Sequence, residues 1–367
     1  AAICIILVEG IFFVVLTVFS IREKIVEAIP YGIRIGITPA IGLMLLNIGF
    51  GSNAGIYSEN GGPFYVLSTF FGSLTPSVAQ NTVGSAYPQM VLYVVTMLVG
   101  VFAIIILNHH KVKASVILGM FISCIVYWAG SFIFLDVNPF ASLQGASFVP
   151  PLKDMLDTTF FKFDFKTFID IGWFTALTLI ITFCMIDMFD TIGTLYGTAT
   201  QAGMLDENGD PIDLNKCMAC DSIATLAGAA LGTSTCTTFV ESASGVAAGG
   251  RTGLTSLVTA ACFFLCLFLT PLASIVPSCA TAPALIYVGV LMLGNFKNVD
   301  MSDMKSAAPA FLTLIMMPLT YSIANGIGIG AIAYTVIAIL TGEFTKKDIM
   351  VAIIGVLFCL KFIFITM

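Results

Sequence analysis

The chain has 367 residues, of which 58% are hydrophobic and 10% are charged, with a formal net charge of −6. An average soluble domain carries about 25% charged residues, so this chain has less than half of the charge that usually keeps a protein in solution. The composition therefore excludes a soluble enzyme, a disordered chain and a collagen-like fibre. It indicates an integral membrane protein.

Apolar segments follow one another along the chain, separated by polar or turn-forming residues. They cover residues 2–19, 33–50, 88–107, 114–135, 171–189, 216–231, 252–275, 282–293, 308–323, 327–340 and 349–365. A helix needs about 20 apolar residues to cross the hydrocarbon core of a bilayer, and helices satisfy their own backbone hydrogen bonds there. The alternating pattern of an outer-membrane barrel strand is absent. We therefore predict an all-α polytopic membrane protein.

A faint internal repeat relates two of these segments. Pro30 and Gly42 recur as Pro277 and Gly289, both at an offset of 247 residues. If the segments alternate in direction across the membrane, these two cross it in opposite senses. Inverted repeats of this kind are typical of secondary transporters, so the pattern favours a transporter.

Two carboxylates lie at the end of the segment 171–189. Asp187 and Asp190 are three residues apart, a spacing that predicts that both lie on one face of a helix. A charge near the centre of the bilayer costs at least about 2.5 kcal/mol, so an acid in such a place is by default a functional residue. The alternative is that the helix ends at Met185 and that both acids lie among the lipid headgroups.

The stretch 232–253 does not have the composition of an ordinary membrane helix. Residues 233–240 are mostly β-branched and polar, which favours an extended strand, whereas 242–250 are small and suit a short, closely packed helix. Glu241 and Ser242 lie at the break, where a serine can cap a helix N-terminus. A half-helix that begins inside the membrane points free N–H groups into a cavity, so we predict a binding site here. The alternative is a plain extracytoplasmic loop.

These features place Asp187, Asp190 and Glu241 in the membrane without an intramembrane Lys or Arg to pair with them, and Arg251 is the one basic residue close to them in sequence. Unpaired buried carboxylates can accept hydrogen bonds from a neutral ligand and can also carry protons. The sequence therefore predicts transport of a neutral, planar, polar substrate together with H⁺. It disfavours an anion, which would meet several negative groups.

The sequence does not indicate an enzyme or a metal centre. Cys217 and Cys220 form a lone CxxC pair, and a zinc site would need further ligands, whereas His109 and His110 lie in another loop. An intramembrane aspartyl protease would need two aspartates on separate spans, and the HExxH motif of zinc proteases is absent. We predict no enzymatic activity, no metal ion, and no cofactor other than H⁺ as the coupling ion.

Around these carboxylates the sequence resembles a known family of transporters. The similarity lies in FDTIGT (residues 189–194), in GTST (232–235), VESA (240–243) and AGGRTGLT (248–255), and in residues 280–286 and 315–324. These stretches are similar to the signatures of the adenine/guanine/hypoxanthine permeases. Those permeases form the AzgA-like branch of the nucleobase:cation symporters, which also include the uracil and xanthine permeases. The resemblance runs along the whole chain.

The resemblance implies a fold of two inverted seven-span repeats, with a core domain, a gate domain and, in each repeat, one span that is half strand and half helix. The chain would begin at the family's fourth span, with the first three missing. Residues 1–29 would end the first core repeat, and 30–170 would form the first gate segment and an outer loop. Residues 171–276 would form the second core repeat with the substrate site, and 277–367 the second gate segment and a C-terminal hydrophobic segment.

The resemblance also implies roles for individual residues. Asp187 and Glu241 would contact the base, and Asp190 would lie beside them and affect proton coupling. Phe239 would either stack on the ring of the base or pack against another helix. The expected substrate-binding residues are Asp187, Thr238, Phe239, Glu241 and Ser242.

The implied function is the proton-coupled uptake of the purine nucleobases adenine, guanine and hypoxanthine across the plasma or inner membrane. The expected partners are the purine and the lipid bilayer, without nucleic acid, and the family resemblance favours a homodimer. Two alternatives stay open, a uracil- or xanthine-type symporter and a sulfate-like anion transporter of the same fold. A basic residue or a neutral helix terminus at the site, in place of the acids, would favour the anion transporter.

Overall fold

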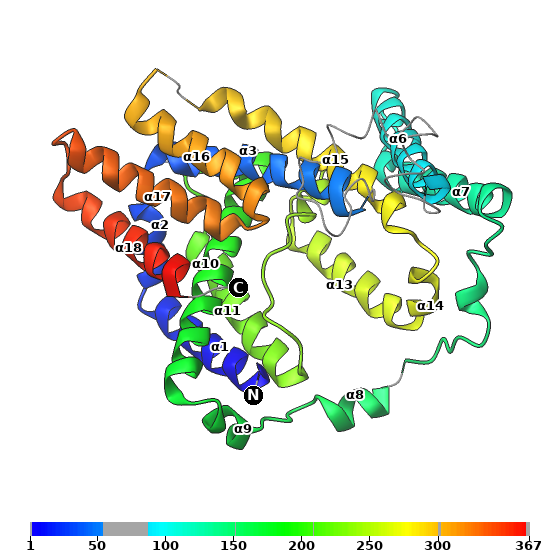
Figure 1. Cartoon of the computed structure of the whole chain (residues 1–367), viewed down its shortest axis with the longest axis horizontal. Helices are drawn as coiled ribbons and strands as arrows, with labels where there is room; N and C mark the ends of the chain where they lie inside the picture. The colour runs from blue at the N-terminus through cyan, green and yellow to red at the C-terminus, as the bar shows by residue number, and fades with distance from the viewer. Residues whose placement is uncertain (1, 54–86, 151, 208, 300–301, 365–367) are drawn as a thin grey trace. The chain divides into compact units, whose positions relative to one another are not determined.

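The computed structural model describes residues 2–53, 87–150, 152–207, 209–299 and 302–364, and helices dominate this part of the chain (Figure 1). Its one β pairing within these ranges is an isolated bridge between Leu205 and Pro211. The α-helices are α1 (Ala2–Val18), α2 (Ile21–Ala28), α3 (Tyr31–Ile48), α6 (Tyr87–His109), α7 (Ser115–Phe134), α8 (Leu152–Thr158), α9 (Phe165–Asp170), α10 (Trp173–Ala202), α11 (Leu214–Leu231), α12 (Ser242–Ala247), α13 (Gly253–Phe268), α14 (Thr270–Ala273), α15 (Ser278–Leu293), α16 (Met304–Thr320), α17 (Ile323–Leu340) and α18 (Ile349–Phe364). Shorter helical turns are η1 (Gly49–Asn53), η3 (Ala141–Leu143), η4 (Gly294–Asn298) and η5 (Lys346–Asp348).

Six helices in the described ranges are long and apolar enough to cross a membrane. They cover Tyr31–Gly51, Pro88–His109, Ser115–Phe134, Thr175–Ala202, Ser278–Lys297 and Ile323–Leu340. Three shorter apolar helices cover Ala2–Val18, Gly253–Phe268 and Met304–Thr320. The prediction of an all-α polytopic membrane protein is therefore confirmed.

Two of the predicted segments differ most from the helices in the structure. α10 has 30 residues and continues to Ala202, whereas the apolar pattern predicted an end at residue 189. Thr191 and Thr194 in its second half are buried. The helix therefore continues through polar residues, which an apolar pattern does not predict as part of a membrane helix. The predicted segment 252–275 is divided into α13 and α14, and Pro271 lies in the first turn of the second helix.

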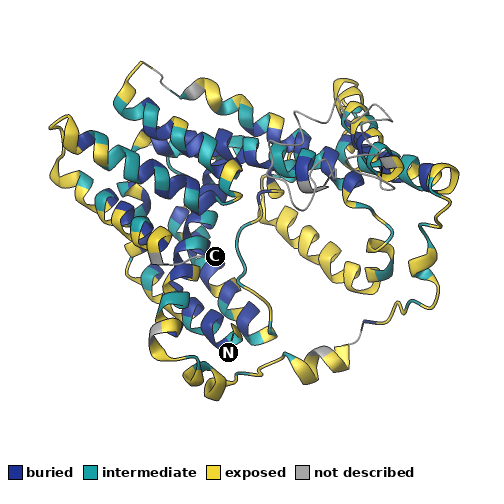
Figure 2. Ribbon diagram, viewed as in Figure 1, coloured by how far each residue is buried: buried dark blue, intermediate teal, exposed yellow. Residues whose placement is uncertain are grey.

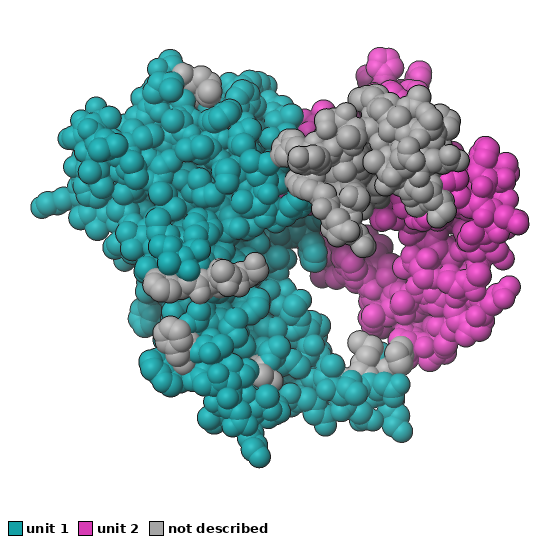
Figure 3. All heavy atoms as spheres, in the orientation of Figure 1, with its two compact units in different colours: residues 1–43, 151–242, 292–367 teal, residues 44–150, 243–291 magenta. Residues whose placement is uncertain are grey.

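The chain folds as two compact units, which are coloured separately in Figure 3. The first unit contains residues 1–43, 151–242 and 292–367. Within it α1 packs against α10 and α11, and α17 packs against α10, α16 and α18. Buried residues gather along these helices (Figure 2). The first unit therefore surrounds α10 with helices from distant parts of the sequence.

Glycines allow close helix crossings in this unit. A Cβ atom on Gly10 of α1 would lie 3.1 Å from the backbone of Leu226 in α11. A Cβ atom on Gly328 of α17 would lie 2.4 Å from the ring of Phe358 in α18. Lipid tails are as apolar as helix surfaces, so van der Waals packing at small residues is a main force between membrane helices. These crossings fix the helices that surround α10.

The second unit contains residues 44–150 and 243–291. α6 and α7 pack together as a hairpin. A small core joins Val94 and Met97 of α6 to Ala282 and Ile286 of α15. The indole N–H of Trp128 in α7 donates a hydrogen bond of 2.9 Å to the backbone carbonyl of Ile275. This contact ties the hairpin to the segment just before α15.

The two segments related by the offset of 247 residues form helices with matching starts. α3 begins at Tyr31, directly after Pro30, and α15 begins at Ser278, directly after Pro277. Proline is well suited to the start of a helix, because the N–H that it lacks has no partner there. The inverted repeat stays a prediction, as does the division into core and gate segments at residues 29, 170 and 276.

Candidate functional site

α10 carries both predicted carboxylates in its middle. The helix begins after Gly172, whose φ is 89°, and ends before Gly203, whose φ is 66°. Positive φ at both ends is accessible to glycine at little cost. Asp187 is 4% exposed and lies well inside these limits. The helix continues past Met185, which contradicts the alternative that it ends there.

The two carboxylates reach different neighbours. Three residues turn a helix by about 300°, so side chains at this spacing point about 60° apart. Asp187 interacts electrostatically with Asp221 of α11, whereas Asp190 accepts a hydrogen bond of 3.2 Å from the backbone N–H of Ala324 in α17. The spacing thus predicted neighbouring positions on α10 but not the separate environments of the two acids.

Asp221 belongs to a buried polar cluster that is built around Arg22 of α2. Arg22 is fully buried, and its Nη2 donates a hydrogen bond of 3.1 Å to Oδ2 of Asp221. Its Nη1 donates to the hydroxyl of Ser222 at 2.8 Å and to a backbone carbonyl of α11 at 3.2 Å. The guanidinium carbon lies 4.4 Å from the ring centroid of Phe13 in α1. Arg22 therefore joins α1, α2 and α11 through contacts that a buried charge requires.

Glu9 of α1 is a further carboxylate in this cluster. It is fully buried, and neither of its oxygens has a hydrogen-bond partner among the described residues. It lies close enough to Asp187 and Asp221 for their charges to interact. The oxygens of Asp187 also lack a well-formed hydrogen bond in the described ranges, although Thr237 lies beside this carboxylate. The cluster thus contains two carboxyl groups without such a bond.

Hydroxyl groups hold the loop after α11 against this cluster. Thr191 of α10 donates a hydrogen bond of 3.0 Å to Oδ1 of Asp221, and its hydroxyl lies 2.9 Å from that of Thr237 in the loop. Thr225 of α11 donates to the carbonyl of Cys236 at 2.9 Å. The loop therefore lies beside Asp187 and is held to α10 by Thr237 and to α11 by the carbonyl of Cys236.

The extended strand predicted over residues 233–240 is not formed. Residues 233–239 have no regular secondary structure, because a strand needs a paired neighbour and none is present in the described ranges. The short helix is found where it was predicted, since α12 begins at Ser242. Phe239 is 64% exposed, Glu241 and Ser242 are also exposed, and Thr238 is half-buried. Their assignment to a base-binding site stays a prediction.

Asp190 has a basic neighbour that the sequence analysis missed. Lys361 of α18 is 7% exposed, and its Nζ donates a hydrogen bond of 2.8 Å to Oδ1 of Asn325 in α17. Its charge interacts with the carboxylate of Asp190. The carboxylate of Asp190, a residue of α10, also lies beside the N-terminus of α17, where backbone N–H groups stabilise a negative charge. Asp190 is therefore both hydrogen-bonded and close to a cation.

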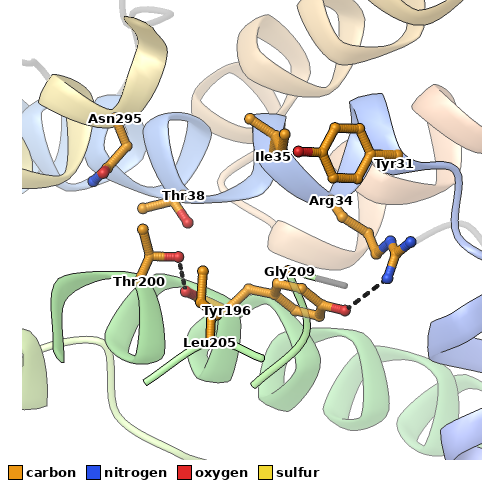
Figure 4. A pocket seen from close by; sticks show the side chains of 9 residues that line it. All are labelled: Tyr31, Arg34, Ile35, Thr38, Tyr196, Thr200, Leu205, Gly209 and Asn295. Carbon is orange, nitrogen blue, oxygen red and sulfur yellow. Dashed lines mark hydrogen bonds between the residues drawn. The ribbon is translucent and has the colours of Figure 1, made fainter. Parts of the chain in front are cut away.

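A pocket of about 350 Å³ lies between the start of α3 and the end of α10. Figure 4 shows the guanidinium of Arg34 directed toward the hydroxyl of Tyr196. Arg34 forms an ion pair with Asp210, which also accepts a hydrogen bond from Tyr196. This group links α3 to the loop after α10. The polar residues of the pocket lining are Tyr31, Arg34, Thr38, Tyr196, Thr200 and Asn295.

The sequence contained a signal for the residues that were missed. Glu9, Asp221 and Lys361 each lie inside a predicted apolar segment, and an ionisable residue in a membrane segment is by default a functional candidate. Arg22 lies three residues after the end of the first segment. The expectation that the intramembrane acids have no basic partner was therefore wrong, since Arg22 and Lys361 are both buried beside acids.

The chain is similar in sequence to a known protein family and to several named proteins. Residues 1–329 match the model of a family described as the Permease family. The chain is 35% identical to the adenine permease AdeQ of Escherichia coli, over 95% of this chain and 71% of that protein. It is 36% identical to the guanine/hypoxanthine permease PbuG of Bacillus subtilis, over 100% of this chain and 76% of that protein. A second guanine/hypoxanthine permease of Bacillus subtilis, PbuO, is 33% identical over 96% of this chain and 75% of its own length.

Proposed function

The chain belongs to the permease family, and from this premise we propose that it transports purine nucleobases across the cell membrane. The observation that carries the proposal is its similarity, over nearly its whole length, to permeases named for adenine and for guanine and hypoxanthine. The chemistry of the first unit agrees with it. A purine presents N–H donors at its edge, and a carboxylate accepts two such bonds without needing a counter-charge from the ligand.

Within this proposal the base is bound by Asp187 and by the loop that follows α11. Thr237 ties that loop to α10, and both oxygens of Asp187 are without a well-formed hydrogen bond in the described ranges. Glu241 accepts N–H groups of the purine edge, and Phe239 covers the ring. Thr238 and Ser242 complete the set of binding residues.

The proposal includes H⁺ as the coupling ion and no other cofactor. A buried carboxyl group such as that of Asp187 is suited to carry a proton, and Asp190 lies three residues from Asp187 on the same helix. A role of Asp190 in proton coupling and a homodimeric assembly also belong to the proposal. Both rest on the family resemblance alone. The protein acts as a transporter and not as an enzyme.

Two other substrates are weighed against purines. A uracil- or xanthine-type symporter would use the same kind of site, so only competition between substrates distinguishes it. An anion transporter is disfavoured by charge, because Glu9, Asp187 and Asp221 share one buried arginine, Arg22. A sulfate-like ion brought to this cluster would meet an excess of negative groups.

The test is uptake by the protein at its full natural length in bacteria that lack purine uptake. Labelled hypoxanthine is supplied with unlabelled adenine, guanine, uracil or sulfate as competitors, and with or without a protonophore. We expect competition by purines alone and loss of accumulation with the protonophore. Competition by sulfate, or absence of purine uptake from a well-expressed protein, would refute the proposal.

Two variants test in the same assay whether Asp187 binds the base. Asp187→Asn is expected to lower hypoxanthine uptake at least about tenfold, because a carboxyl group that bonds the base and can carry a proton is replaced by an amide that cannot take up a proton. Asp154→Asn is the matched control, since Asp154 is an exposed acid on α8. Equal losses in both variants, or no loss in the first, would count against Asp187 as a base-binding residue.

A further inference from the structure

The buried cluster around Arg22 contains more acid than base. Glu9, Asp187 and Asp221 are 0%, 4% and 6% exposed, and Arg22 is the base that is hydrogen-bonded to one of them. Three ionised acids and one arginine would leave two negative charges in a buried region. Uncompensated charge in such a place is costly, so the cluster favours protonation of part of its acids.

The hydrogen bonds show which acid of the cluster is stabilised in its ionised form and which acids lack that stabilisation. Asp221 has Arg22 at 3.1 Å on one oxygen and the hydroxyl of Thr191 at 3.0 Å on the other. Both bonds stabilise the ionised form. Glu9 has no hydrogen-bond partner for either oxygen in the described ranges, and Asp187 has none of good geometry. Protons in this cluster therefore belong to Glu9 and Asp187.

The helices that pack against α1, which carries Glu9, are α2, α9, α10 and α11. α9 contributes only the exposed Lys166 and Asp170 near its ends. The charged or titratable groups that interact with Glu9 or share its cluster are Cys184 and Asp187 of α10, Asp221 of α11 and Arg22 of α2. Of these, Asp187 is the acid without a cationic hydrogen-bond partner.

We propose that Glu9 is a second proton-binding group of the coupling site and that it shares the coupled protons with Asp187. This inference rests on the proposed purine transport, which supplies the event to which the protons are coupled. Each carboxylate takes up one H⁺ from the side from which the purine enters and becomes a neutral carboxylic acid. It releases the same H⁺ on the other side, and the purine is neutral throughout.

Two interacting carboxyl groups at one site titrate as a pair. When one of them holds a proton, the other loses a negative neighbour, so the charge state of each depends on the other. The pair can therefore bind purine while protonated and release the protons when water reaches it. Asp190 does not belong to this pair, because Ala324 and Lys361 compensate its charge.

The test separates proton-driven accumulation from exchange. The full-length protein and its Glu9→Gln variant are reconstituted in vesicles, and labelled hypoxanthine is followed with an inward proton gradient of one pH unit. A gradient of one pH unit supports at most about tenfold accumulation for each coupled proton. We expect Glu9→Gln to lower the limiting accumulation by about tenfold and to retain exchange of labelled for unlabelled hypoxanthine across the same vesicles.

Glu27→Gln is the matched control, because Glu27 is an exposed glutamate on the neighbouring helix α2. It is expected to keep both exchange and accumulation. Unchanged accumulation by Glu9→Gln would overturn the role of Glu9 while leaving the proposed function intact. Absence of hypoxanthine exchange by the unsubstituted protein would instead refute the proposed function. Accumulation that follows a sodium gradient and ignores the proton gradient would refute proton coupling at Glu9.

A second measurement applies even where Glu9→Gln does not fold. Binding of hypoxanthine to the purified protein at fixed pH is accompanied by proton uptake, which a pH-indicator dye records. In Asp187→Asn, at saturating hypoxanthine, we expect proton uptake to fall but to persist through Glu9. Complete loss of proton uptake by a variant that still binds would overturn the proposal.

Discussion

Replacement of Arg22 by methionine should lower the free energy of unfolding by about 4 kcal/mol, within the range for breaking a buried ion pair. Arg22 is fully buried and donates three hydrogen bonds of 2.8 to 3.2 Å to α11. A hydrogen bond to a charged group contributes about 1.5–3 kcal/mol, which gives an upper limit well above 4 kcal/mol. Methionine fills much of the same volume against Phe13 and offsets part of the loss.

The measurement is denaturation of the purified protein in detergent, followed by tryptophan fluorescence or by loss of the monodisperse elution peak. Lys24→Met is the control, because Lys24 lies exposed on the same helix and should change the free energy of unfolding by less than about 0.5 kcal/mol. The double variant Arg22→Met/Asp221→Asn should recover part of the loss, because it no longer buries an unpaired charge. Equal stability of Arg22→Met and the unsubstituted protein would refute the reasoning.

Two further substitutions test other contacts of the first unit. Arg34→Ala should lower the free energy of unfolding by about 1–2 kcal/mol, because its ion pair with Asp210 is partly exposed and lies between the surface and buried cases; an unchanged melting transition would show that the pair adds no stability. Gly328→Ala should cost about 1–3 kcal/mol by overpacking, because its Cβ would lie 2.4 Å from the ring of Phe358. Gly355→Ala on the adjacent helix is the control, since its nearest neighbour would be 3.5 Å away, and a similar loss in both variants would contradict the packing argument.

Hydropathy predicted most of the helices because a bilayer imposes a local rule on sequence. Segments such as 88–107 and 114–135 need little more than length and apolar composition to span the membrane, and α6 and α7 follow them closely. The rule fails where a helix buries polar residues against other helices. α10 extends beyond its predicted end because Thr191 and Thr194 face protein and not lipid.

The strand predicted over 233–240 failed for a related reason. β propensity reflects how a side chain fits beside neighbouring strands, so it has no consequence where a neighbouring strand is absent. In the described ranges Thr237 of this segment instead bonds to Thr191 of α10, and the carbonyl of Cys236 accepts a hydrogen bond from Thr225 of α11. The break before Ser242 was predicted correctly because it depends on local residue types, serine followed by small residues.

The sequence by itself determined that this is a polytopic helical membrane protein and to which family it belongs, and it predicted that Asp187 and Asp190 share one helix face. It could not determine which acids are compensated. Arg22 and Asp221 are 199 residues apart, and Asp190 and Lys361 are 171 apart (361 − 190), so each pairing depends on how α10 packs with distant helices. The tertiary structure decides this. It provides hydrogen-bond partners for Asp190 and Asp221, whereas Glu9 and Asp187 have no well-formed hydrogen bond in the described chain. Charge compensation is a property of three-dimensional neighbours, because the interaction between two groups depends on their separation in space and on the surrounding dielectric, not on their separation along the chain.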